Sequence, residues 1–172
     1  MVDLKFLRAY SPTLQQEVQL LIAQGKLGTY LNTRYPQATH TVQTDKALYQ
    51  FTNQLKQDFL KNAPAIDKVC YDSKLDVIHH ALGLHTAVSR VQGSKLKAKK
   101  EIRIASLFKE AAPEFLTMIV AHEIAHLKEP QHNKAFYQLC QHIEPNYHQL
   151  EFDLRLWLTF KELKLPKQQA QS

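Results

Sequence analysis

The sequence has few cysteines and few glycines, and it lacks any long apolar run. Among its 172 residues are 2 cysteines and 4 glycines. Cys70 and Cys140 stand alone, so they form neither a paired metal-binding motif nor a disulfide framework. No apolar segment reaches the ~20 residues that a membrane span needs, and the first residues lack the apolar stretch of a secretion signal. We therefore expect a cytoplasmic protein with reduced thiols and no membrane partner.

The chain is long enough to bury a core of its own. Its length fits one domain, which we expect to span residues 1–172, with a helical N-terminal part over 1–64 and the functional core over 65–172. Hydrophobic residues make up 44% and charged residues 22% of the chain, which argues against a disordered protein.

Positive charge is in excess and is concentrated in one segment. The chain has 22 basic and 16 acidic residues, a net charge of +6. Residues 90–103 contain six basic residues and one acidic residue, Glu101, which leaves a local charge of +5. The six are Arg90, Lys95, Lys97, Lys99, Lys100 and Arg103. Such a cluster attracts phosphates, and these residues are candidates for binding a phosphorylated substrate. The alternative is a solvated loop whose lysines only aid solubility.

Capping residues and prolines predict four helices. Apolar residues at helical spacing follow each start, and the stretch that ends at Pro36 has the composition of a turn. The predicted helices begin after Ser11-Pro12, Thr44-Asp45, Pro113 and Asn133, and they end at Gly25, before Pro64, at Pro130 and at Ile143.

The middle of the chain predicts a small sheet. Lys68–Tyr71, Thr86–Val91 and Glu101–Ala105 are short, β-branched and partly alternating, and we expect them to form an antiparallel sheet. The fold class is therefore α+β. The last apolar segment, 150–160, fits both the strict alternation of a strand and one side of a helix, and periodicity alone leaves both open.

The strongest motif is His122-Glu123-Ile124-Ala125-His126, inside the third predicted helix. Residues i and i+4 of a helix lie one above the other, so both imidazoles can converge on one metal ion. Glu123 lies ~100° around the helix, where its carboxylate can take a proton from water. The pattern predicts one zinc ion per chain, with Glu123 as the general base.

An open zinc site needs a third protein ligand. His132 follows the break at Pro130, where the chain can fold back toward the helix. Glu144 and Glu151 are the alternative ligands. A hydrolase also needs a group that stabilises the charge developing in the transition state, and the candidates for that role are Tyr137, His142, Tyr147 and His148.

The ten-residue offset from His122 to His132 also occurs in metzincins. Metzincins carry a glycine where this chain has Glu129, and they need a methionine turn further along the chain. Both methionines, Met1 and Met118, precede the motif. The sequence therefore does not fit a metzincin.

The stretch HEIAHLKEPQHNKAFYQLC, with SRVQG and KLKAKKEIRIA before it and EPNYHQLEFDLRLWL after it, resembles the YgjP-like metallopeptidase family. That family is also described as metal-dependent hydrolases and is related to the WLM and SprT-like zincins. The resemblance covers nearly the whole chain. It implies a zincin-like core, one zinc ion held by His122, His126 and His132, Glu123 as catalytic base, and a helical C-terminal segment. It does not fix the substrate, because relatives carry the label peptidase or UTP pyrophosphatase.

Three functions follow from these features. The favoured one is a zinc peptidase acting on a peptide or protein, for which Glu101–Ala105 could supply an edge strand for substrate addition. The second is a nucleoside-triphosphate (UTP) pyrophosphatase, which would use the basic segment but lacks a glycine-rich phosphate loop. The third is a weakly active module that binds nucleic acid or protein, and nucleic acid is not the favoured partner.

Overall fold

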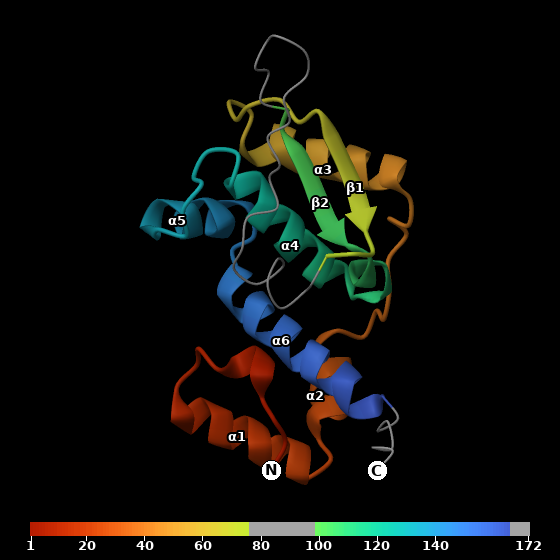
Figure 1. Cartoon of the computed structure of the whole chain (residues 1–172), viewed down its shortest axis with the longest axis vertical. Coiled ribbons are helices and arrows are strands. Elements are labelled where there is room, and N and C mark those ends of the chain that lie inside the picture. The colour runs from red at the N-terminus through yellow and green to blue at the C-terminus, as the bar shows by residue number, and fades with distance from the viewer. Residues whose placement is uncertain (76–98, 166–172) are drawn as a thin grey trace. The chain divides into compact units, whose positions relative to one another are not determined.

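The computed structural model describes residues 1–75 and 99–165 (Figure 1). Helices and two strands alternate in this part of the chain, which confirms the α+β class. In chain order the elements are η1 (Lys5–Leu7), α1 (Pro12–Ala23), α2 (Leu27–Arg34), α3 (Asp45–Phe59), β1 (Lys68–Asp72), β2 (Glu101–Ala105), η3 (Ser106–Glu110), α4 (Pro113–Ala125), α5 (Lys134–Ile143) and α6 (Tyr147–Lys164). In these ranges, none of the helices has the length and apolar character needed to cross a bilayer.

Local chemistry sets the helix starts where the sequence predicts them. The Ser11 hydroxyl accepts the N–H of Leu14 at 3.3 Å, at the start of α1. The Thr44 hydroxyl accepts the N–H of Ala47 at 3.1 Å, at the start of α3. Gly25 follows α1 with φ of 66°, a left-handed conformation that glycine adopts without strain.

Three segments differ from the simplest interpretation of the sequence. The stretch before Pro36, predicted as a turn, contains helix α2. Helix α4 ends at Ala125 with His126 as its C-cap, before Pro130. The C-terminal segment, which periodicity left open, is the helix α6, as the family resemblance implies.

The sheet is parallel, so the antiparallel prediction is wrong. Strands β1 and β2 pair in register from Lys68 opposite Glu101 to Asp72 opposite Ala105. Alternation and β-branching identify strands but carry no information on their direction, and parallel neighbours need a long crossover connection. The predicted strand Thr86–Val91 lies outside the described residues.

The chain forms two compact units. The central unit is continuous, Gln37–His148, whereas the terminal unit combines Met1–Pro36 with Gln149–Ser172. In the central unit, α3 packs against β1, and α4 packs against both β2 and α5 (Figure 1). The prediction of one domain over 1–172 stays a prediction.

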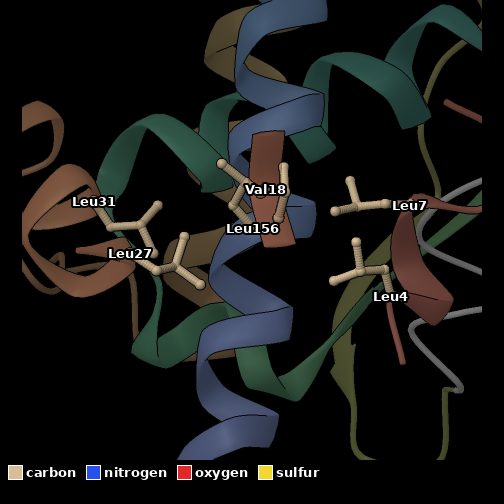
Figure 2. Close-up of a cluster of buried hydrophobic side chains, with 6 residues drawn as sticks. All are labelled: Leu4, Leu7, Val18, Leu27, Leu31 and Leu156. Carbon is tan, nitrogen blue, oxygen red and sulfur yellow. The ribbon is translucent and has the colours of Figure 1, made fainter. Parts of the chain in front are cut away.

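The terminal unit has its own apolar core. Its fully buried members come from both ends of the chain, because η1, α1 and α2 supply five residues and α6 supplies Leu156. Figure 2 shows these side chains: Leu4, Leu7, Val18, Leu27, Leu31 and Leu156. Gly28 lets α2 approach α6 closely, since a Cβ there would lie 2.9 Å from the ring of Phe160.

A buried carboxylate ties α6 to α2 within the terminal unit. Asp153 has no exposed surface. It accepts hydrogen bonds from the hydroxyls of Tyr30, at 3.0 Å, and Tyr35, and from Arg34 Nε at 3.1 Å. Burial is the main reason why the pKa of Tyr30 rises to about 12, and the negative charge of Asp153 adds to the rise. Burial and the hydrogen bond to Asp153 also raise the pKa of Tyr35.

These tyrosines should make the terminal unit sensitive to alkali. A pKa that is higher in the folded than in the unfolded chain adds stability below the unfolded value of about 10, and this stability is lost as the pH rises through the folded value. We therefore expect the free energy of unfolding to fall between pH 10 and pH 12. Urea unfolding followed by the fluorescence of Trp157, which packs against the same core, measures it. The Tyr30→Phe, Tyr35→Phe double variant should show a flatter pH dependence, and an unchanged slope would contradict this assignment.

Candidate metal centre

Helix α4 places two of the predicted ligands in a buried position. From Phe115 to Ala125 every residue of α4 except Thr117 is buried. An α-helix that is apolar on all sides belongs in the interior, so the polar residues of its last turn are held in a dry environment. His122 is 3% exposed and His126 is 6% exposed.

The chain then folds back and brings His132 to the same point. The turn after α4 leads to Asn133, whose side chain caps α5 by accepting the N–H of Phe136 at 2.9 Å. His132 directly precedes this cap. The Nε2 atoms of His132 and His126 lie 3.0 Å apart, and those of His126 and His122 lie 3.1 Å apart.

This spacing suits a metal ion. Two nitrogens bound to one tetrahedral zinc at ~2.0–2.1 Å lie ~3.4 Å from each other. The ligand atoms of the three histidines all lie within 4.8 Å of one another. The three imidazoles could therefore hold a metal ion, as the sequence predicts.

The outer ring nitrogens of two histidines have hydrogen-bond partners. His126 Nδ1 lies 3.0 Å from the carbonyl oxygen of Glu129. A carbonyl can only accept, so Nδ1 carries the proton and Nε2 keeps its lone pair for a metal. His122 Nδ1 lies 2.7 Å from the hydroxyl of Tyr147, which has no exposed surface.

Phe136 is a residue of this centre that the sequence analysis missed. Its ring is fully buried. The ring centroid of Phe136 lies 4.4 Å from that of His126 and 4.9 Å from those of His122 and His132. Apolar packing on three imidazoles restricts their rotation and excludes water from one side. The sequence did carry one indication of this position. Phe136 is three residues after the helix cap Asn133, and the capping hydrogen bond holds Phe136 beside the loop that contains His132.

Glu123 lies in the same dry helix turn. It is 4% exposed and follows His122 directly, so it points ~100° away from that ligand around the helix. A carboxylate buried beside a metal centre can exchange protons with a bound reactant without competition from bulk water.

The candidate transition-state stabilisers fall into different places. Tyr147 contacts His122 from behind, on the nitrogen that faces away from the cluster. Tyr137 is half-buried, with its ring centroid 6.4 Å from that of His132. His148 is exposed and stacks near Tyr137, with centroids 5.4 Å apart. His142 is exposed, and its Nε2 lies 3.1 Å from the carbonyl oxygen of Phe59. The structure therefore brings Tyr147 and Tyr137 beside the cluster and leaves His142 in a surface contact; the stabilising role of all four residues stays a prediction.

The alternative third ligands do not belong to the cluster in the described part of the chain. Glu144 caps the end of α5, and its carboxylate accepts the N–H of Asn146 at 3.0 Å. Glu151 forms an i,i+4 ion pair with Arg155 at 3.5 Å. His132 is the donor that accompanies His122 and His126.

The basic segment is described only at its end. Arg90, Lys95 and Lys97 lie outside the described residues, whereas Lys99 and Lys100 precede β2 and are partly exposed. Arg103 pairs with two carboxylates instead of facing solvent. Its guanidinium lies 2.9 Å from Asp72 and 3.1 Å from Glu101, and the contact with Asp72 is the main reason why the pKa of Arg103 is raised. The phosphate-binding role of Arg103 and of the other basic residues stays a prediction.

Strand β2 is half of a two-stranded sheet in the described residues, where it pairs with β1. Four of its five residues, Glu101, Ile102, Ile104 and Ala105, are 5% exposed or less. A peptide that adds to a sheet pairs with backbone groups at the edge, and burial of the residues does not decide whether that edge is open. Substrate addition along β2 stays a prediction.

Comparison with known proteins identifies the class of enzyme to which the chain belongs. The family model described as YgjP-like, metallopeptidase domain matches residues 8–156, and this chain belongs to that family. It is therefore an enzyme of the hydrolase type, and the sequence prediction of a metallohydrolase is confirmed.

One curated relative shares a high sequence identity with this chain. The curated UTP pyrophosphatase of Escherichia coli (strain K12) is 61% identical over 159 residues, which cover 92% of this chain and 95% of that protein. No solved structure matches the chain.

Proposed function

We propose that this enzyme is a zinc-dependent pyrophosphatase that hydrolyses UTP to UMP and pyrophosphate. The observation that carries the proposal is the 61% identity to a UTP pyrophosphatase across almost the full length of both chains. The two chains align over 92% and 95% of their lengths. The alignment therefore leaves little room for a substrate-binding element that is present in one chain and absent from the other.

The donor set fits zinc. Three imidazole nitrogens suit zinc better than magnesium or calcium, which prefer oxygen ligands. His122, His126 and His132 would hold the ion and leave one position open, as in catalytic zinc sites. Zinc in such a position supplies Lewis acidity, which lowers the pKa of water and offsets the charge on the substrate's oxygens.

Glu123 serves as the general base in this proposal. Its carboxylate accepts one proton of the attacking water, and the water oxygen bonds to phosphorus as the α–β anhydride bond breaks. Pyrophosphate and UMP leave. Tyr137, whose ring lies near that of His132, is the candidate donor of a hydrogen bond to the phosphoryl oxygens on which negative charge develops.

The charge of the chain supports a polyphosphate substrate. The net charge is +6, and Lys99 and Lys100 are partly exposed. Lysines near a cleft raise the local concentration of an anionic substrate. UTP is a cytoplasmic nucleotide, and the free thiols of Cys70 and Cys140 agree with a reducing compartment.

A metallopeptidase is the second candidate. The description of the family model favours it, and the chemistry of an activated water serves a peptide carbonyl as well as phosphorus.

Removal of the metal tests the proposal directly. Chelator-treated protein should release no pyrophosphate from UTP above background, and one equivalent of zinc should restore release. UMP and pyrophosphate are measured together, because equal amounts identify cleavage of the α–β bond. The His132→Ala variant provides a second test. It should lose both zinc and activity but stay folded, because the hydrophobic core of the chain does not depend on the metal.

The result separates the two functions. Zinc-loaded protein that cleaves a peptide panel but leaves UTP intact would overturn the pyrophosphatase proposal and favour the peptidase. Activity in the chelated protein, or an active His132→Ala variant with unchanged zinc content, would overturn the metal site.

A further inference from the structure

The hydrogen bond between Tyr147 and His122 has two possible directions, and only one is compatible with a metal. If the tyrosine hydroxyl donates to Nδ1, the neutral imidazole carries its proton on Nε2, which then points into the cluster as N–H. If Nδ1 donates to the hydroxyl oxygen, Nε2 presents a lone pair. The distance of 2.7 Å between the two atoms suits either direction.

We infer that Tyr147 is a positioning residue that holds His122 in the Nδ1-protonated tautomer and thereby strengthens metal binding. This inference rests on the proposed metal site and assigns it an outer residue. Partners of this kind fix the tautomer and the ring orientation of metal-binding histidines.

The surroundings of Tyr147 suit this role. The residue has no exposed surface, and His122 is 3% exposed, so water does not readily replace the hydroxyl. The rings are nearly parallel, with an interplanar angle of 22°. A short turn sets the position of Tyr147 at the start of α6, because its N–H bonds to the carbonyl of Glu144 at 2.9 Å.

His122 differs from His126 in what orients it. The backbone carbonyl of Glu129 orients His126, and no side-chain substitution removes it. The partner of His122 is a side-chain hydroxyl. Replacing Tyr147 by Phe therefore removes the hydrogen-bond partner of His122 by deleting a single oxygen atom.

The test compares the zinc affinity of Tyr147→Phe with that of the wild-type protein, by competition with a chromogenic chelator. Loss of the hydroxyl should weaken zinc binding by ~10–100-fold. Tyr71→Phe is the matched control, because it removes the hydroxyl of a tyrosine of the same unit whose partner is the backbone carbonyl of Val42, at 2.6 Å. The control should bind zinc within about threefold of the wild type.

A second measurement reads the tautomer without the metal, because zinc bound at Nε2 places the ring proton on Nδ1 whatever Tyr147 does. Long-range ¹H–¹⁵N spectra of the zinc-free wild-type protein should show the neutral His122 ring with its proton on Nδ1. The zinc-free Tyr147→Phe variant should lose this preference, and a merely structural role for Tyr147 would leave it unchanged.

The outcomes separate this inference from the proposed function. If the wild-type protein binds no zinc, the proposed metal site fails. If the wild-type protein binds zinc but Tyr147→Phe binds it equally well, or the neutral His122 ring of the zinc-free wild-type protein carries its proton on Nε2, the positioning role alone is overturned.

Discussion

Replacing Glu123 by Gln should lower kcat for UTP hydrolysis by ~10²–10⁴-fold, the usual contribution of a general base. Glutamine has nearly the same shape as glutamate but does not take a proton from water. The substitution leaves His122, His126 and His132 unchanged, so the zinc content should stay at that of the wild-type protein. The decrease should appear in kcat more than in KM, because the carboxylate acts in the transition state.

Glu129→Gln is the matched control for this experiment. Glu129 lies three residues after His126, and its carboxylate accepts a hydrogen bond from Asn133 at 3.3 Å. The control changes the same charge near the same cluster and should keep kcat within about threefold of the wild type. Equal activity of Glu123→Gln and the wild type would remove Glu123 from the mechanism.

Replacing Asp153 by Ala should destabilise the terminal unit by about 3 kcal/mol. The carboxylate has no exposed surface, and its loss leaves the hydroxyls of Tyr30 and Tyr35 without their acceptor. A buried group left without its partner costs ~1–3 kcal/mol, and each of these half-buried hydroxyls should contribute toward the lower end of that range. The Arg34 side chain is 44% exposed, so its charge can return to water and adds little to the cost.

Trp157 makes this effect measurable in the unit where it occurs. It is the one tryptophan of the chain and packs against the terminal core, so its fluorescence follows the unfolding of that unit in urea. Asp58→Asn is a suitable control, because Asp58 is exposed on α3 and contacts only Gln54 in the described structure. A decrease in the free energy of unfolding below about 1 kcal/mol for Asp153→Ala would show that this carboxylate contributes little to the stability of the unit.

Much of the metal cluster was predictable because its determinants are local. The spacing of His122 and His126 fixes them on one face of a helix, and Pro130 prevents that helix from continuing to His132, so the chain can fold back there. The starts of α1 and α3 followed equally from Ser11 and Thr44, whose side chains bond to the next turn.

The missing parts depend on contacts between distant segments. Strand direction is set by the connection, which the composition of Lys68–Tyr71 and Glu101–Ala105 does not encode. Tyr147 entered as a stabiliser of the transition state, since nothing in the sequence shows that its hydroxyl faces His122 Nδ1. The sequence likewise does not show the partners of Arg103, which was predicted to bind phosphate. Its ion pair with Asp72 joins residues on neighbouring strands.

The remaining ambiguity, in residues 150–160, came from a helix buried on more than one side. Leu154, Leu156 and Leu158 are all 6% exposed or less, and they follow one another at every second position. Burial of both Leu154 and Leu156 on a helix imitates the alternation of a strand, so periodicity alone misleads.

The discontinuous make-up of the terminal unit has a consequence for the order of events during synthesis. Residues Met1–Pro36 leave the ribosome before the central unit, but the core they build includes Leu156, which leaves after it. The central unit is continuous in sequence, so its folding does not require a later segment, because domains fold as their segments emerge. The histidine cluster should therefore assemble while Leu27 and Leu31 are still exposed to solvent, and the nascent chain depends on α6 to cover them.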